Sequence, residues 1–470
     1  MAQKLIAVLD IGKTLSKLSL WNSGGEMLTR RTRPNRTVVA EHYDALDVDG
    51  IGPWVIETLA GFVGEGPIGA IIPVSHGAGV VVIRDGALVV PPLDYEFAIP
   101  TQTLAEYRKQ RDPFSITGSP ALPDGLNIGS QLHFLEELNP DVFEGAALLP
   151  WTQYWAWFLS GASNSEVTSL GCHSDLWSPA QNDFSPLAKQ RRWAEKFAPI
   201  ASAGDIVGTL RPNIAKATGL TSDTAVYCGL HDSNAALVAA RGFDEIADND
   251  ATILSTGTWF VAMRTPRDEV DLSSLGETRD CLINVDFEGR AIPSGRFMGG
   301  REIETLIGID TRRIDIKPDQ PALMRAAGKV VESGAMILPT LANGFGPFPH
   351  GRGRWVDMPD EWPERRAAAC LYAALVADVT LELVGAKDVL LIEGRFAEAE
   401  VFVRALASLR PEIAVYTANA HNDVSYGALR LLNARLKPKT TLSRVEPLKI
   451  DLERYRREWR RRAERAERGA

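Results

Sequence analysis

Two short segments of this chain share one pattern: an apolar run, a small polar turn with a glycine, and a second apolar run. They cover residues 4–20 and 251–263, about half a chain apart. The pattern predicts a strand, a tight turn and a strand in each. The turns offer backbone N–H groups and hydroxyls, which suit phosphate oxygens. The duplication predicts two lobes that bind one nucleotide, although two unrelated hairpins would look the same.

Length and composition bound the class of protein. A chain of 470 residues is too long for one hydrophobic core and predicts two domains. Its 45% apolar and 24% charged residues are typical of a soluble globular protein. The formal net charge of −9 argues against broad nucleic-acid binding.

The cysteines and apolar runs indicate the compartment. Four cysteines lie far apart and form no CxxC pair, which argues against a zinc site or a disulfide framework and fits a reducing cytosol. They are Cys172, Cys228, Cys281 and Cys370. The short apolar run before Asp10 predicts a strand rather than a signal peptide, and no stretch approaches the roughly 20 apolar residues that span a bilayer. We expect a cytoplasmic protein without membrane contact.

Local patterns divide the chain into two halves. The first half predicts strands at 4–10, 15–21, 68–74 and 79–84, and helices at 53–64, 129–138 and 186–199. The polar segment 243–250 predicts a boundary between domains 1–243 and 244–470. The second half alternates helices at 300–307, 320–333, 365–385, 398–409 and 424–436 with strands at 335–339, 388–393 and 412–416. This alternation predicts an α/β fold.

The arginine-rich tail at 450–468 predicts a terminal helix. Leu452, Tyr455 and Trp459 fall on one helix face. A basic helix can contact nucleic acid or a membrane surface. A docked terminal helix with a solvated basic face is the interpretation that we favour.

The first turn has residues suited to a magnesium-bound phosphate. Asp10 can hold Mg²⁺ through water molecules, because Mg²⁺ keeps most of its hydration shell. Gly12 lets the backbone approach phosphates, and Lys13 or Lys17 can supply a positive charge. The sequence through Thr14 resembles the end of a P-loop. We reject that motif, because it lacks the first glycine and the following residues alternate like a strand.

Asp232 opens a predicted helix after Gly229 and His231. A carboxylate there can be a general base that takes a proton from the hydroxyl that accepts a phosphoryl group. It can equally be the N-cap of the helix, a frequent role of aspartate. From the local sequence alone, the N-cap is favoured.

Polar residues interleaved with aromatic ones form a candidate sugar site, because sugar hydroxyls need hydrogen bonds and sugar C–H faces stack on rings. The candidates are Asp94, Tyr95, Glu96, Trp151, Gln153, Tyr154, His173 and Asp175. Taken singly, each aromatic residue can instead belong to the hydrophobic core, and each aspartate can instead belong to a turn.

Taken together, these segments resemble the FGGY family of carbohydrate kinases from Asp10 to about Leu432. Four motifs in order carry the resemblance: residues 10–17, 229–236, 255–258 and 424–429. Residues 126–132 and 149–168 lean toward rhamnulokinase- and fuculokinase-like members.

The resemblance implies two actin- and hexokinase-like (ribonuclease H-like) domains with Mg²⁺-ATP in the cleft between them, an N-terminal sugar-binding domain and a C-terminal nucleotide-binding domain. It implies ATP-dependent phosphorylation of a small ketose or polyol such as L-rhamnulose, L-fuculose or a xylulose-like sugar, with Asp232 as the base. The implied metal contact is Asp10, and the implied nucleotide contacts are Asp10, Gly12, Lys13, Thr14, Lys17, Thr256, Gly257, Thr258, Gly394 and Arg395. The implied sugar contacts are His76, Gly77, Asp94, Glu96, Trp151, Gln153, His173, His231 and Asp232.

Two departures from the family pattern concern the nucleotide. Lys13 stands where the family commonly has Thr or Asn, and 393–398 lacks the first glycine and the serine of the adenine-side motif. A non-catalytic relative that binds sugar or nucleotide is the main alternative. An actin-like assembly protein is a third, and a homodimer is compatible with each. Retention of both Asp10 and Asp232 favours catalysis.

Overall fold

The computed structural model describes residues 4–310, 315–418 and 424–469. By their internal contacts, the described residues form two compact units. The first comprises Met1–Gly242, Ile283–Ala291 and Asp423–Lys437, and the second comprises Phe243–Leu282, Ile292–Asn422 and Pro438–Ala470. Two stretches of the predicted C-terminal half therefore pack with the first unit. The assignment of sugar and nucleotide binding to separate halves stays a prediction.

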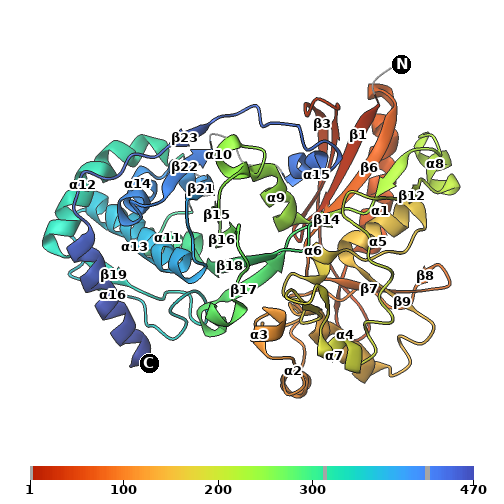
Figure 1. The fold of residues 1–470 in the computed structure, drawn as a ribbon, viewed down its shortest axis with the longest axis horizontal. Helices are drawn as coiled ribbons and strands as arrows, with labels where there is room; N and C mark the ends of the chain where they lie inside the picture. Colours follow the sequence, from red (N-terminus) through yellow and green to blue (C-terminus); the bar gives the residue numbers. More distant parts are fainter. Residues whose placement is uncertain (1–3, 311–314, 419–423, 470) are drawn as a thin grey trace. The chain divides into compact units, whose positions relative to one another are not determined.

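The first unit is built on a mixed sheet (Figure 1). Its central strand β1 (Leu5–Ile11) is almost entirely apolar and buried, so it packs on both faces. It pairs antiparallel with β2 (Leu15–Trp21) and parallel with β6 (Ile68–Ser75). The strand order is β12-β13-β6-β1-β2-β3, with β14 also beside β6. The outer strands are β3 (Met27–Pro34), β12 (Ile206–Thr209), β13 (Ala225–Tyr227) and β14 (Leu230–His231).

Helices and small sheets complete this unit. Its helices are α1 (Val48–Phe62), α2 (Thr101–Arg108), α3 (Phe114–Thr117), α4 (Ile128–Leu138), α5 (Trp151–Ser160), α6 (Val167–Leu170), α7 (Pro186–Gln190), α8 (Pro212–Thr218), α9 (Asp232–Ala240) and α15 (Val424–Leu432). Its short strands are β4 (Thr37–Val39), β5 (Asp44–Leu46), β7 (Val80–Arg84), β8 (Ala87–Leu88), β9 (Ala147–Pro150), β10 (Trp177–Ser178) and β11 (Asp183–Phe184).

The second unit is organised around a sheet of order β17-β18-β16-β15-β21-β22-β23. Its strands are β15 (Ala251–Thr256), β16 (Phe260–Thr265), β17 (Cys281–Val285, of which the last three residues group with the first unit), β18 (Ala291–Phe297), β21 (Val389–Gly394), β22 (Ala414–Ala418) and β23 (Leu442–Arg444), and a separate pair is β19 (Met336–Leu338) and β20 (Arg354–Val356). Its helices are α10 (Asp244–Ala247), α11 (Gly299–Ile307), α12 (Gln320–Ser333), α13 (Trp362–Leu383), α14 (Glu400–Leu409) and α16 (Glu453–Arg468). Helix α13 is buried through most of its length, as expected for an apolar core helix.

The two sheets repeat one pairing scheme. Strands β3-β2-β1-β6-β13-β12 match β18-β16-β15-β21-β22-β23, with the same parallel or antiparallel relation at every step. The two sheets differ in chain order at one end: β12 precedes its neighbour β13 along the chain, whereas β23 follows its neighbour β22. The two hairpins that the sequence predicts are confirmed as β1–β2 and β15–β16, at equivalent places in the two sheets.

The predicted helix over 186–199 is wrong beyond its first turn. Helix α7 ends at Gln190, and Arg192 has a φ of 60°, which a right-handed helix does not accommodate. The turn places Trp193 in the core, where its indole N–H donates to Glu136 Oε1 at 2.9 Å. Burial of this large aromatic side chain therefore overrides the helical pattern.

Helix α16 confirms the docked terminal helix. Tyr455 and Trp459, one turn apart, are buried and donate to the carbonyls of Ala335 and Ile337 at 2.7 Å each. On the neighbouring face, Arg456 and Arg460 bind the fully buried carboxylate of Asp378 on α13 at 2.6–2.9 Å. Arg410 binds the same carboxylate at 2.7 Å. Three arginines on one buried carboxylate thus join α16 to the core of the second unit.

We expect Asp378→Asn to destabilise the protein by about 3–5 kcal/mol, because it removes the one fully buried carboxylate that three partly buried arginines share and leaves them only more exposed acidic partners. Urea-induced unfolding measures the change. The matched control is Glu453→Gln, whose carboxylate is exposed and lies 3.7 Å from Arg456; it should change stability by less than about 1 kcal/mol. Equal effects of the two substitutions would contradict the role of Asp378.

Candidate functional site

Three parallel strand ends bring the predicted residues of the first unit to one edge of its sheet. Strands β1 and β14 both run parallel to β6, and Ile11 and His231 are each in register with Ser75. Asp10, His76 and Asp232 are neighbours of these three residues in sequence. The carboxyl ends of parallel strands are where open α/β sheets commonly bind ligands.

The first turn is held by side chains on both sides. Lys17 faces Asp10 across the hairpin, and its Nζ lies 2.9 Å from Asp10 Oδ2. Asn35 donates from its side chain to Gly12 O at 2.8 Å and from its backbone to Thr14 O at 2.9 Å. The sequence reasoning missed Asn35, because it lies 21 residues beyond the turn. Its contacts fix the loop that the phosphates would approach.

Lys13 points away from Asp10 and toward the candidate sugar residues. Its Nζ forms an ion pair with Asp94, lies 3.3 Å from Glu96, and sits 5.1 Å from the centre of the Tyr95 ring. Asp94 also accepts from Thr37 Oγ1 at 2.8 Å. Burial alone would raise the pKa of Asp94, but the hydrogen bonds from Lys13, Glu96 N and Thr37 outweigh it and lower the pKa. The Asp94 carboxylate is therefore charged at neutral pH.

A pocket of about 210 Å³ in the first unit brings seven of the predicted residues together. They are Gly12, Lys13, Thr14, His76, Asp94, Glu96 and Trp151. Asn35, Arg36, Thr37 and Asp47 also line this pocket, and the sequence reasoning named none of them. Three of these seven predicted contacts, Lys13, Asp94 and Glu96, have charged side chains, so the pocket is suited to a small polar ligand.

His76 forms an aromatic wall of this pocket. Its ring stacks on Trp151 at a centroid distance of 6.0 Å and meets Tyr95 edge-on at 5.1 Å. Burial lowers the pKa of His76 to about 4, although the charge of Asp232 opposes the shift. His76 is therefore neutral at pH 7, and its Nδ1 has no hydrogen-bond partner among the residues that the structure describes. A neutral ring with an unpaired nitrogen suits a sugar hydroxyl.

Asp232 is the first residue of α9, and the N-cap position belongs to His231, so the favoured N-cap interpretation is wrong. His231 Nε2 lies 3.2 Å from Asp232 Oδ1, and Ser233 Oγ donates to the same oxygen at 3.2 Å. Burial would raise the pKa of Asp232, but the hydrogen bond from His231 and the charge of that ring outweigh burial and lower the pKa. Asp232 is therefore a carboxylate at neutral pH and able to accept a proton.

Gln153 supports the turn before Asp232 and is not placed on the pocket. Its Nε2 donates to the carbonyls of Cys228 and Gly229 at 3.3 Å and 3.2 Å. Gly229 has a φ of 75°, and a Cβ at this position would collide with the carbonyl of Pro73. Glycine is therefore required here for the chain to turn into His231 and Asp232.

Gly77 has a packing role in the structure. Its carbonyl accepts from Cys172 Sγ at 3.2 Å, and a Cβ on Gly77 would collide with that sulfur. The absence of a side chain lets the segment after His76 approach Cys172 and His231 closely.

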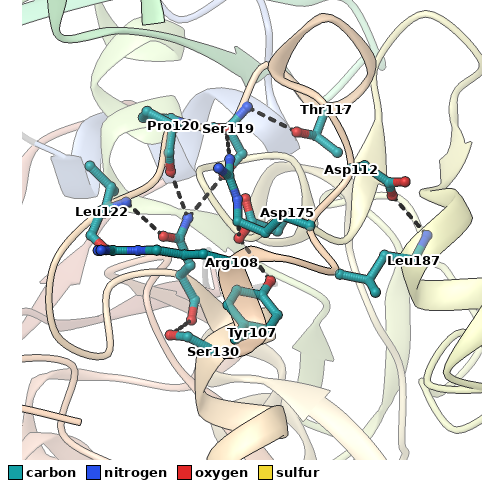
Figure 2. A network of polar contacts seen from close by, with 12 residues as sticks. Tyr107, Arg108, Asp112, Thr117, Ser119, Pro120, Leu122, Ser130, Asp175 and Leu187 are labelled. Atoms are coloured by element: carbon teal, nitrogen blue, oxygen red, sulfur yellow. Dashed lines mark hydrogen bonds and ion pairs between the residues drawn. The ribbon is translucent and has the colours of Figure 1, made fainter. Parts of the chain in front are cut away.

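His173 lies outside the residues that line the pocket, and its backbone carbonyl accepts a hydrogen bond from Asn127. Asn127 Nδ2 donates to the carbonyls of His173 at 2.8 Å and Pro120 at 3.0 Å. Nearby, Asp175 Oδ2 accepts from Tyr107 at 2.8 Å (Figure 2). Asp175 therefore has a structural partner, as the turn-aspartate alternative predicts.

Glu166 is a fully buried carboxyl group to which the sequence analysis assigned no role in the site. Its Oε2 accepts from Thr168 Oγ1 at 2.5 Å and from Thr168 N at 3.0 Å. The same Thr168 hydroxyl accepts from His231 N at 2.9 Å. This chain of contacts fixes the backbone of the residue that orients Asp232. Nothing in the local sequence distinguishes Glu166 from an ordinary helix cap.

We expect Glu166→Gln to change how stability depends on pH. Burial raises the pKa of Glu166 to about 7, so the folded protein binds a proton between about pH 4.5 and 7 that the unfolded chain releases. This contribution to stability is complete at low pH and is lost as the pH rises through 7. Urea unfolding should show that the variant gains stability relative to the unmodified protein from pH 5 to pH 8. A difference that is constant with pH would contradict the assigned pKa.

The second turn, in the other unit, follows β15. Thr256 is buried, and its hydroxyl donates to Glu393 O at 2.5 Å and accepts from Phe396 N at 3.1 Å. Thr256 therefore joins the turn to the segment after β21, while Gly257 and Thr258 remain partly or largely exposed. In that segment Gly394 has a φ of 88° and faces the Thr256 backbone. The departures of 393–398 from the family motif thus lie directly beside the predicted phosphate turn.

The side chain of Arg395, in the same segment, is held by an aromatic ring and a carboxylate. Its guanidinium lies 5.1 Å from the centre of the Phe396 ring and 3.7 Å from Glu304. These contacts hold a cation next to Gly394. A phosphate or a base edge could use that cation in place of the glycine and serine of the family motif.

The residues around Asp10 fit a magnesium ion that is held mainly by phosphates and water. No group of three or more His, Cys, Asp or Glu side chains able to hold a metal occurs among the described residues. Asp10 can offer a metal ion one carboxylate, and Lys17 already forms an ion pair with that carboxylate. Mg²⁺ in phosphate-transfer sites needs only one or two carboxylates. Asp10 is thus suited to Mg²⁺-nucleotide and not to a free ion.

Comparisons with known proteins agree with the resemblance drawn from the motifs. Residues 248–440 match the family model described as the C-terminal domain of carbohydrate kinase FGGY. L-Fuculokinases of Salmonella typhi and Escherichia coli (strain K12) are 26% identical over 305 residues. The match covers 61% of this chain and 61% of each fuculokinase, so the chain aligns with somewhat less than two thirds of their length.

Solved structures extend the likeness to the whole chain. A carbohydrate kinase from Novosphingobium aromaticivorans is 60% identical, with a TM-score of 0.96 over 99% of this chain and 100% of that one. The xylulose kinase from Rhodospirillum rubrum is 16% identical, with a TM-score of 0.81 over 98% and 99% of the two chains. At this identity, the second likeness concerns the fold alone. None of the described helices is long and apolar enough to cross a membrane.

Proposed function

This chain belongs to the FGGY family of carbohydrate kinases, with its two actin- and hexokinase-like domains, and we propose that it phosphorylates a hydroxyl of a small ketose or related sugar with ATP. The observation that supports the proposal most is Asp232. It is a partly buried carboxylate that His231 keeps ionised, and its charge acts on His76 at the wall of the pocket. An ionised base beside a sugar-sized polar pocket is what phosphoryl transfer to a hydroxyl requires.

The pocket of the first unit supports a monosaccharide as the acceptor. The His76 ring, backed by Trp151, offers an aromatic surface for C–H groups, while Asp94 and Glu96 offer acceptors for hydroxyls. The solved and curated relatives include kinases of fuculose and xylulose, so we propose L-fuculose, L-rhamnulose or a xylulose-like ketose. Release of ADP across a panel of ketoses and polyols, with ATP and Mg²⁺, identifies the sugar. No ADP release with any member would favour the non-catalytic relative.

In the proposed reaction Asp232 takes the proton of the attacking hydroxyl as that oxygen bonds to the γ-phosphorus, and the bond to the β-phosphate oxygen breaks to leave ADP. His231 holds the Asp232 carboxylate in place, and Thr168 with Glu166 holds His231. The turns at Gly12–Thr14 and Gly257–Thr258 are the proposed phosphate contacts, and Asp10 is the proposed contact to the hydrated metal. Mg²⁺, when bound, neutralises charge that develops on the phosphate oxygens.

The nucleotide and the compartment follow from the same proposal. We propose ATP as the phosphoryl donor, with Arg395 beside the nucleotide. A cytoplasmic location fits a consumer of ATP whose four cysteines are free and buried.

We expect Asp232→Asn to lower kcat by about 10²–10⁴-fold, because general-base catalysis contributes about that much. Asparagine keeps the shape of aspartate and can still accept from His231, so the fold and the affinity for the sugar should persist. Steady-state kinetics and calorimetric titration with the sugar measure the two effects. A kcat close to that of the unmodified enzyme would contradict the assignment of Asp232.

Asp10→Ala should raise the Mg²⁺ concentration needed for half-maximal activity by about 10–100-fold, as expected for a residue that acts on a metal through its waters. Affinity for the sugar should hardly change. The control is Lys17→Met, which removes the partner of Asp10 and leaves the carboxylate. An Asp10 variant with the magnesium dependence of the unmodified enzyme would exclude this role.

A further inference from the structure

A second pocket, distant in sequence from the proposed catalytic residues, is lined by five arginines. It lies in the second unit, where the C-terminal half of α16 meets the segment around β20, and its volume is about 490 Å³. The arginines are Arg352, Arg354, Arg461, Arg462 and Arg465. No Asp or Glu is among the described residues that line it. In a protein with a net charge of −9, this concentration of cations in a concave site requires an explanation.

The fold builds this pocket from two rigid sides. On α16, positions 461, 462 and 465 share one face, because residues three and four apart lie next to each other on a helix. On the other side Arg354 opens β20, which pairs with β19, and Arg352 lies two residues earlier. The hydrogen bond from Trp459 Nε1 to Ile337 O, at 2.7 Å, fixes α16 against β19. The arginines therefore face one space because the backbone holds them there.

The charges in the pocket are only partly neutralised by the protein. Glu458, on the same helix face, accepts from Arg461 at 2.7 Å and from Arg462 at 2.5 Å. These two hydrogen bonds lower the pKa of Glu458 to about 2. Arg352, Arg354 and Arg465 have no side-chain ion pair or hydrogen bond within the described part of the chain. Three guanidinium groups thus remain available to a ligand.

We propose that this pocket binds a small molecule carrying two or more phosphate groups. Guanidinium groups bind phosphate oxygens in pairs of parallel hydrogen bonds, and several around one pocket select multiple negative charges. The volume lies within the range of ordinary ligand pockets and exceeds what a single phosphate fills. A concave site of this size favours a small molecule over a nucleic acid or an acidic peptide. The site does not depend on the proposed kinase reaction.

Calorimetric titration of the full-length protein with tripolyphosphate, at low salt, tests the proposal. The double variant Arg352→Gln/Arg354→Gln should lose one binding event or weaken it by about tenfold or more, and so should Arg465→Gln. Arg457→Gln is the matched control, because Arg457 is an exposed arginine of α16 outside the pocket, near Glu453. Binding at the proposed phosphate turns is unaffected by all three changes, so the difference between variants isolates this pocket.

Hydrogen exchange locates the event. Tripolyphosphate should slow exchange of backbone amides in the last two turns of α16 in the unmodified protein and in Arg457→Gln, but not in the pocket variants. Inositol trisphosphate is a second, organic ligand with several phosphate groups and should give the same result. Single inorganic phosphate should bind at least about tenfold more weakly than tripolyphosphate or inositol trisphosphate. Identical titrations for all variants, or equal affinity for phosphate and tripolyphosphate, would overturn the proposal. Thermal melting of each variant shows whether it is folded. If the double variant does not fold, Arg465→Gln provides the test, because Arg465 lies on an exposed helix face.

Discussion

The parallel pairing of β1, β6 and β14 is the constraint on which the candidate site depends. Asp10, His76 and Asp232 are separated by 66 and 156 residues along the chain, yet each lies within one residue of the end of one of three adjacent strands. Parallel hydrogen bonding places the ends of these strands side by side. The register of the pairing also decides which face each side chain occupies, because a slip of one residue would turn every side chain to the other face. The register of a buried, apolar strand such as β1 is therefore what brings the chemistry together.

Buried charge is organised in two different ways in the molecule. Asp378 is surrounded by three arginines, two from α16 and one, Arg410, from the residue that follows α14, and these ion pairs hold the terminal helix. Among the residues that the structure describes, His231 and Ser233 both contact Oδ1 of Asp232, so Asp232 stays ionised while its other oxygen can accept a proton. Full compensation suits a structural carboxylate, whereas partial compensation suits a base.

The two arginine-rich regions of α16 show how one sequence pattern can serve two purposes. Arg456 and Arg460 turn inward and bind Asp378, while Arg461 and Arg465 lie on the face that borders the second pocket. Composition alone predicts a basic solvated helix. The helical period divides the arginines between a buried ion-pair network and an open cationic site.

The sequence by itself determined the repeated hairpins and the α/β alternation, because these depend on local periodicity and on motifs in order. It also placed Gly12, Lys13, Thr14, His76, Asp94, Glu96 and Trp151 in the set that forms one pocket. It failed where contacts between distant segments decide the outcome. Burial of Trp193 ended a predicted helix, Gln153 turned to the backbone before Asp232, and Asn35 and Glu166 became supports of the site. Only the tertiary structure decides such roles, because the free energy of a buried polar side chain depends on the partners that folding brings to it.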